Sequence, residues 1–287
     1  MEFFTLTTGL LLPWLAGAVW LMAIEARFNR STRPNRLRQA GYGFFLGYCG
    51  LYLAVLLSNA LRDQVAKDLN KPKKVVTSVS GYASVFSDET ALDIMMMAYA
   101  GLRNKRLVEL CQQHGINAVG LSGLDGKMIQ GERNKGIRIK EDGKLKIVRD
   151  LSGKPRSINI ELLKLLLDNG YTPVLSVPII DENNFAINSE NDDIVNVIQD
   201  ALNADKIIQL IEAPGFLDDK DNPDSLVHKM TKEEIKHREE QVEGRMKRKM
   251  LALSKLFETG ANTVIICDGR NEHPIKDGLA GKGTLIQ

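Results

Sequence analysis

Residues 157–180 read SINIELLKLLLDNGYTPVLSVPII, and they decide the fold class. The first part follows Ser157, is rich in leucine and ends at Gly170, which predicts a helix capped by the serine. The second part, residues 171–180, is a short apolar run typical of a buried strand. A helix that leads into a buried strand is the repeating unit of parallel sheets covered by helices on both faces.

The same alternation continues along the chain. Strands are predicted at 116–123, 206–217 and 261–269, and helices at 190–204 and 243–257. In residues 136–150, GIRIKEDGKLKIVRD, apolar and charged residues alternate on both sides of Asp142-Gly143, and this pattern predicts a β-hairpin. We therefore expect an α/β protein with three layers around a mostly parallel sheet, whose ligands bind at the carboxyl ends of the strands.

The first 61 residues are more apolar than the rest of the chain. The average composition of 44% hydrophobic and 26% charged residues does not show this difference. Residues 3–24 and 40–61 contain no charged residue, and each run is long enough to cross a bilayer. We therefore predict a transmembrane hairpin of two helices in residues 1–61, followed by a separate domain at 62–287. A signal peptide or a hairpin buried in a protein core are the alternatives.

The charges around these apolar runs do not fix an orientation in the membrane. Residues 25–39 contain five arginines and one glutamate, and a second basic cluster follows the second run at 62–74. The positive-inside rule favours the cytoplasm for both clusters. A helical hairpin would place them on opposite sides of the membrane, so the rule favours neither orientation.

Four segments could carry chemistry, although the chain has no GxGxxG, GxxxxGK[ST], HExxH or GxSxG motif. They are NSENDD (188–193), IEAPGFLDD (211–219), EGRMKRK (243–249) and GLAGKGTLIQ (278–287). Helix capping or a solvated basic face would also explain such patterns. No spacing of cysteine and histidine predicts a metal site, and nothing in the sequence predicts nucleic-acid binding.

These segments follow one another in the order found in the amino acid kinase family, together with GYASVFSDET (81–90), GINAVGLSGLDGK (115–127) and NGYTPVLSVPIIDE (169–182). The chain resembles that family over residues 62–287, in particular the acetylglutamate kinase branch and its archaeal kinases of 2-aminoadipate or glutamate bound to the amino-group carrier protein LysW. The resemblance implies phosphorylation of a side-chain carboxylate with ATP and Mg²⁺, in lysine or arginine biosynthesis. It also implies a cytoplasmic kinase domain and a homo-oligomer.

The resemblance assigns roles to individual residues. Lys249 corresponds to the lysine that stabilises the transferring phosphoryl group, and Asp192 to the aspartate that orients catalytic lysines. Asn188, Gly81 and Tyr82 correspond to the substrate side. The nucleotide side corresponds to Ala213, Pro214, Gly215, Gly281, Lys282 and Gly283.

The chain departs from the family pattern near its N-terminal end. The family's first strand carries a Lys-x-Gly-Gly motif and its second strand ends in a glycine loop, and both bind phosphates. Here SNAL occupies the loop positions 58–61, no lysine precedes Lys67, and Val85 replaces an arginine of many relatives. We expect the first strand and the glycine loop to be missing. Residues 51–57 could form the second strand, which would exclude a membrane helix there.

Two functions are therefore open. One is a kinase of carrier-bound 2-aminoadipate or glutamate with impaired phosphate binding. The other is a non-catalytic remnant, membrane-tethered or chimeric, that only binds nucleotide or the carrier protein.

Overall fold

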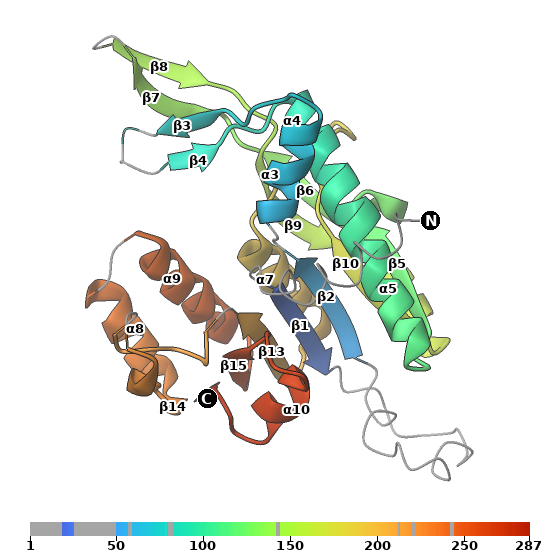
Figure 1. The fold of residues 1–287 in the computed structure, drawn as a ribbon, viewed down its shortest axis with the longest axis vertical. Helices are drawn as coiled ribbons and strands as arrows, with labels where there is room; N and C mark the ends of the chain where they lie inside the picture. The colour runs from blue at the N-terminus through green and yellow to red at the C-terminus, as the bar shows by residue number, and fades with distance from the viewer. Residues whose placement is uncertain are drawn as a thin grey trace, which may run out of the picture.

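A computed structural model describes residues 19–25, 50–56, 59–77, 79, 83–141, 144–211, 213–219, 222–241 and 244–287. Its centre is an eight-stranded sheet covered by helices (Figure 1). In spatial order the strands are β14 (Lys229–Met230), β16 (Thr284–Ile286), β15 (Val264–Asp268), β13 (Lys206–Ile211), β1 (Val19–Glu25), β2 (Gly50–Leu56), β10 (Thr172–Ser176) and β5 (Ala118–Ser122). The predicted α/β class is confirmed.

Most strand pairs within the two halves of this sheet are parallel, and β15 with β16 is an antiparallel pair. Strand β13 pairs with β15, and β10 pairs with β2 and β5, all in parallel. Strand β1 lies between the halves and runs antiparallel to both β13 and β2. The sheet is therefore mixed at its centre, where residues from the N-terminal part of the chain are inserted.

Helices cover the two faces of the sheet. They are α3 (Asn59–Asp68), α4 (Glu89–Met95), the π-helix η1 (Met96–Arg103), α5 (Asn104–Gln113), α6 (Ile160–Asp168), α7 (Asn191–Leu202), α8 (Lys232–Gln241), α9 (Gly244–Glu258) and α10 (Pro274–Leu279), with short 3₁₀ turns η2 (Asp125–Lys127) and η3 (Pro223–Ser225). The core lies in two layers, one on each face of the sheet, because successive side chains of a strand point to opposite faces. Ile207 and Ile266 pack in one cluster with residues of α7 and α9. Ile208 and Ile265 pack in another, beside α10.

The helix predicted after Ser157 begins later than expected. Strand β9 (Gly153–Ile158) continues through Ser157, and the side chain of Asn159 accepts a bond from Leu162 N at 3.0 Å. Asparagine is an equally good N-cap, and Ser157 is needed in the ladder that pairs β9 with β6 (Ile129–Arg133). The prediction of a serine cap was therefore wrong by two residues.

The predicted membrane helices are wrong wherever they fall on described residues. Residues 19–24 belong to β1 and residues 50–56 form β2, while the rest of 3–24 and most of 40–61 lie outside the description. In the part of the chain that the structure describes, no helix combines the length and apolar composition that a bilayer requires. A strand covered on both faces is apolar throughout, so its sequence resembles a short piece of a membrane helix.

The expected gap in the sheet is also absent, because β1 occupies it. Seven consecutive residues of β1 pair with β2, and four of them pair with β13 on the other side. Ala23, for example, lies opposite Ile208 of β13 and Tyr52 of β2. Residues 19–25 and 50–56 therefore share one sheet with strands from residues 62–287.

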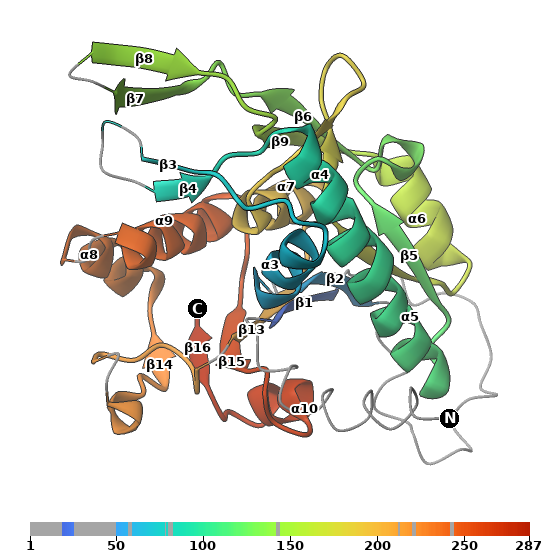
Figure 2. The same ribbon diagram turned by 45° about the horizontal axis from the view of Figure 1, so that its top comes forward.

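Smaller sheets surround this core. Strands β12 (Ala186–Ile187), β11 (Ile179–Ile180), β6 and β9 form one of them. Two hairpins, β3 (Val75–Thr77) with β4 (Ala83–Val85) and β7 (Ile137–Glu141) with β8 (Lys144–Val148), project side by side from the body of the molecule (Figures 1 and 2). The second confirms the hairpin predicted at 136–150, whose turn residues 142–143 lie outside the description.

Candidate active site

A cluster of hydrogen-bonded side chains joins three segments that are far apart in the sequence. Asn188 Nδ2 donates to Ser87 Oγ at 3.1 Å, and the Ser87 amide donates to Asp150 Oδ2 at 3.4 Å. Ser152 Oγ donates to the other Asp150 oxygen at 2.6 Å. We call Ser87, Asp150, Ser152 and Asn188 the substrate-side cluster, because the family resemblance places Asn188 and the 81–88 segment on the substrate side.

Backbone bonds hold this cluster rigidly. Asn188 N donates to Leu151 O at 2.7 Å, Gly153 N donates to Asn188 O at 2.9 Å, and Leu151 N donates to Ser87 O at 2.6 Å. Asp150 is 3% exposed. The sequence did not identify Asp150 or Ser152, because they meet Ser87 and Asn188 only through the pairing of segments that are far apart in the chain. Gly81 and Tyr82, predicted at this site, lie outside the described residues.

Helix α7 begins directly after the cluster. Its N-cap, Glu190, makes no side-chain capping bond. The buried atoms Ser189 Oγ and Asn191 Oδ1 have no hydrogen-bond partner in the described part of the chain. Because α7 leads into β13, its N-terminus lies at the edge where β13 ends, as predicted for a ligand site. First-turn amides of a helix have no partner within the helix, and together with the helix dipole they favour an anionic ligand at this edge.

The two residues predicted to be catalytic belong to helices that pack together. Asp192 lies in the first turn of α7, and Lys249 lies in α9. Lys255 Nζ of α9 is 3.8 Å from Asp193 Oδ1 of α7. Lys249 precedes Lys255 by six residues, roughly 9 Å along the helix axis. Its side chain lies outside the description, so its role remains a prediction.

The predicted nucleotide-side residues come together from two distant segments. Ala213, Pro214 and Gly215 follow β13, and the 281–283 turn leads into β16 beside the end of β15. Phe216 N donates to the buried Thr284 Oγ1 at 2.7 Å, which joins the two segments. Both lie at the carboxyl ends of β13 and β15, where nucleotides bind in sheets of this type.

Two glycines permit this contact. A Cβ at Gly215 would lie 2.7 Å from Thr284 Oγ1 and 3.0 Å from its backbone nitrogen. A Cβ at Gly283, where φ is +152°, would lie 2.5 Å from Ile266 O. The family resemblance predicts nucleotide contacts for these glycines, and that role stays a prediction. In the structure each glycine also permits close packing between protein segments.

Replacing Gly215 by alanine should destabilise the protein by about 1–3 kcal/mol, because the added methyl overpacks a buried contact with Thr284. Thermal unfolding followed by circular dichroism measures the change. The control is Gly101→Ala in η1, whose methyl would lie 3.4 Å from the nearest atom in helical backbone. That control should be neutral or stabilising.

Charged side chains at this edge are already paired. Arg270 donates from Nε and Nη2 to both oxygens of Asp268, at 2.8 and 2.6 Å, and these bonds hold the pKa of Asp268 below its ordinary value. Lys282 Nζ lies 3.0 Å from Asp277 Oδ1. In the structure the ammonium group of Lys282 is paired with Asp277 of α10, and its contact with a nucleotide remains a prediction.

Cys267 lies under the same turn and is 1% exposed. Burial raises the pKa of its thiol to about 12. The folded state therefore holds the proton, and the stability linked to this group falls as pH rises from the unfolded pKa through the folded one.

Alkylation by iodoacetamide at pH 8 should leave Cys267 unmodified in the folded protein, because the reactive species is the thiolate. A Cys49→Ser background removes the cysteine outside the description, and mass spectrometry locates the label. Urea should make both Cys267 and the buried Cys111 reactive. Rapid labelling of Cys267 in the native protein would contradict the packing described above.

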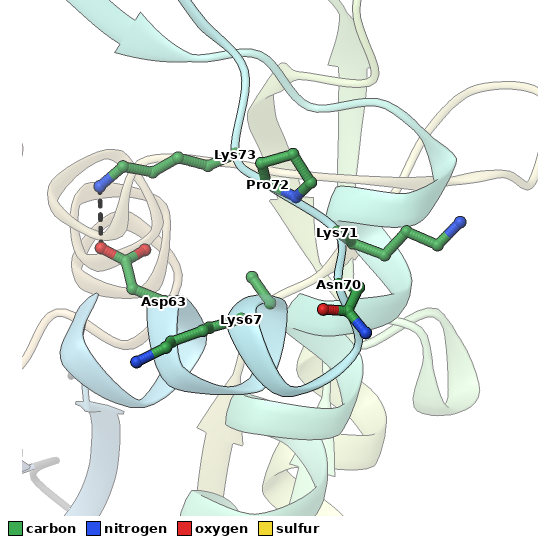
Figure 3. A pocket seen from close by; sticks show the side chains of 7 residues that line it. Asp63, Lys67, Asn70, Lys71, Pro72 and Lys73 are labelled. Atoms are coloured by element: carbon green, nitrogen blue, oxygen red, sulfur yellow. Dashed lines mark hydrogen bonds and ion pairs between the residues drawn. The ribbon is translucent and has the colours of Figure 1, made fainter.

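A separate hollow of about 520 Å³ lies between α3 and residues 70–73. Lys73 Nζ bridges to Asp63 Oδ2 across it at 2.8 Å, and Lys67 and Lys71 extend away in different directions (Figure 3). Burial opposes ionisation of Asp63, but hydrogen bonds from Lys73 and Arg62 outweigh it and lower its pKa. Its charges are paired or diverge, so this hollow does not form a convergent ligand site.

The described residues offer few ligands for a metal ion. Over the residues that the structure describes, no group of three or more histidine, cysteine or acidic side chains could hold a metal ion. A magnesium ion bound mainly through the phosphates of a nucleotide would need no such group.

Comparisons with known proteins show which family this chain resembles. The sequence profile of the amino acid kinase family matches residues 51–268. The chain is 38% identical over 232 residues to a [LysW]-aminoadipate kinase of Thermus thermophilus, covering 80% of this chain and 86% of that protein. It is 39% identical over 225 residues to a [LysW]-aminoadipate kinase of Deinococcus radiodurans, covering 78% and 77%.

More distant comparisons support the fold. An acetylglutamate kinase of Methanopyrus kandleri is 34% identical over 203 residues, covering 70% of this chain and 78% of that protein. The crystal structure of smu.665 from Streptococcus mutans UA159 superposes with a TM-score of 0.61 at 18% identity, over 79% of this chain and 82% of that one.

Proposed function

Because this chain belongs to the amino acid kinase family and is a kinase, we propose that it transfers the γ-phosphoryl group of ATP to the side-chain carboxylate of 2-aminoadipate or glutamate held on the carrier protein LysW. The observation that carries the proposal is the 38% identity to a [LysW]-aminoadipate kinase over 86% of that relative. The product would be an acyl phosphate of lysine or arginine biosynthesis. We place this reaction in the cytoplasm, where ATP is available.

The chain's own residues would share the work between the two sides of the site. Asn188 and the neighbouring α7 N-terminus would hold the anionic substrate, and the 213–215 and 281–283 segments would hold the nucleotide. Lys249 would neutralise charge on the transferring phosphoryl group, and Asp192 would orient the catalytic lysine. Phosphoryl transfer asks little more of a protein than such positioning and neutralisation. Mg²⁺, when bound with ATP, would neutralise phosphate oxygens.

The phosphate side fits less well. Asn59–Leu61 lie in the first turn of α3 instead of a glycine loop, and no lysine precedes Lys67. Loss of one preorganised donor typically lowers the rate by about 10²–10³. This observation favours the second candidate function, a protein that binds nucleotide or LysW without catalysis.

One assay separates the two candidates. The full chain is incubated with ATP, Mg²⁺ and LysW carrying 2-aminoadipate, and the acyl phosphate is trapped with hydroxylamine. Separate arms contain LysW-glutamate and N-acetylglutamate. Hydroxamate with a LysW-linked substrate supports the kinase. Nucleotide binding without hydroxamate in any arm would refute it and favour the binding protein.

A further inference from the structure

Large apolar side chains are exposed on the two hairpins that project from the body of the molecule (Figure 1). Leu145 and Ile147 of β8 are 71% and 67% exposed, and Val75 and Val79 of the β3–β4 hairpin are each 55% exposed. A bond from Val79 N to Arg138 O, 2.8 Å long, joins the two hairpins. Apolar side chains gathered on one projecting unit, rather than scattered singly, indicate a binding surface.

The register of β7 and β8 defines the exposed face. Arg138 lies directly opposite Ile147, so both point to the same side, and Leu145 shares that side because it is two residues from Ile147. We call Arg138, Leu145 and Ile147 the flap face. Lys144, on the same strand, points to the opposite side. The flap face therefore combines two apolar anchors with a cation.

The charge of this hairpin selects the kind of partner. Residues 135–149 contain six lysines and arginines and two acidic residues, so their net charge is +4. Opposite charge across an interface accelerates encounter and rejects other partners. A basic hairpin that carries apolar anchors and Arg138 on one side is complementary to an acidic protein that has an apolar patch of its own.

The hairpins also lead directly to the substrate-side cluster. Strand β4 ends at Val85, two residues before Ser87, and β8 ends at Val148, two residues before Asp150. At about 3.3 Å per residue, Ile147 lies roughly 10 Å along the chain from Asp150. A protein docked on the flap face could therefore present a tethered substrate to the cluster.

We propose that the flap face is the docking surface for an acidic carrier protein that presents its bound amino acid to the substrate-side cluster. The identification of the partner as LysW rests on the proposed function, whereas the surface is defined by the structure. Docking and catalysis are separable, because the flap face belongs to the β7–β8 hairpin, whereas the predicted catalytic residues Asp192 and Lys249 belong to α7 and α9.

Calorimetric titration of the full-length protein with purified LysW carrying 2-aminoadipate, without ATP, tests the docking surface independently of turnover. Arg138→Glu and the double change Leu145→Ser with Ile147→Ser should each raise the Kd at least tenfold, because truncated central anchors dominate binding. Matched controls are Lys144→Glu, the same charge change on the opposite side, and Leu165→Ser on α6, where the leucine is 60% exposed. Both controls should stay within about twofold, and raising the salt concentration should weaken wild-type binding.

The outcomes separate the two proposals. Unchanged affinity of the flap variants, or equal weakening by the controls, would overturn the docking surface and leave the kinase proposal standing. Formation of hydroxamate with N-acetylglutamate but no binding of LysW would overturn the carrier as partner. If only the flap variants lose LysW binding, and the wild-type protein forms no hydroxamate in any arm, the docking surface is supported and catalysis is refuted.

Discussion

Replacing Ala23 by proline should destabilise the whole kinase domain by roughly 3 kcal/mol or more. Ala23 lies in the middle of β1, opposite Ile208 on one side and Tyr52 on the other. Proline lacks the amide that the ladder requires, and it is tolerated only at sheet edges, strand starts and bulges. Since domains are stable by about 5–15 kcal/mol, the loss removes a large share of the total.

Thermal unfolding and the soluble fraction after expression measure this effect. The midpoint should fall by roughly 6–12 °C, given a shift of about 2–4 °C per kcal/mol at this size. Ala83→Pro is the matched control, because Ala83 begins the peripheral strand β4, where proline is better tolerated. A melting curve of Ala23→Pro equal to wild type would show that β1 does not complete the sheet.

Deletion of residues 1–49 tests the same insertion more severely. Without β1, the ladder positions of β13 and β2 that now pair with it would be open. Open edges pair with other chains, so we expect aggregation rather than a smaller soluble kinase. A monodisperse, folded 50–287 protein in size-exclusion chromatography would contradict this expectation.

Changing Lys249 to methionine should lower the rate of acyl phosphate formation by about 10²–10³, with little change in the melting temperature. Methionine keeps most of the aliphatic length and removes only the ammonium charge. An interaction made mainly in the transition state lowers kcat and kcat/KM together. Hydroxamate formation under saturating ATP and LysW-aminoadipate gives kcat.

The same helix offers a control for this experiment. Lys255→Met removes an equal charge from α9, at a residue that is 3.8 Å from Asp193 and 43% exposed. A pair this exposed contributes about 0–1 kcal/mol, so kcat should change little. Equal losses in both variants would reject the specific role of Lys249 and indicate a general effect of charge on α9.

The candidate site was predicted where its residues share a short segment. Asn188 and Asp192 lie within five residues of each other, and the nucleotide-side turns lie at strand ends that periodicity identifies. Asp150 and Ser152 were not predicted, because only the pairing of distant segments brings them to Asn188. No local pattern reports such contacts.

The sequence by itself determined the class of fold, the hairpin at 136–150 and the family, since periodicity, turn residues and ordered motifs are local properties of the chain. It could not determine whether residues 19–24 and 50–56 form strands or parts of membrane helices, because a strand inside a covered sheet and part of a membrane helix are both continuously apolar. Only the tertiary structure decided this. It supplied β13 and β10 as ladder partners, so that the backbone groups of β1 and β2 are paired within the sheet.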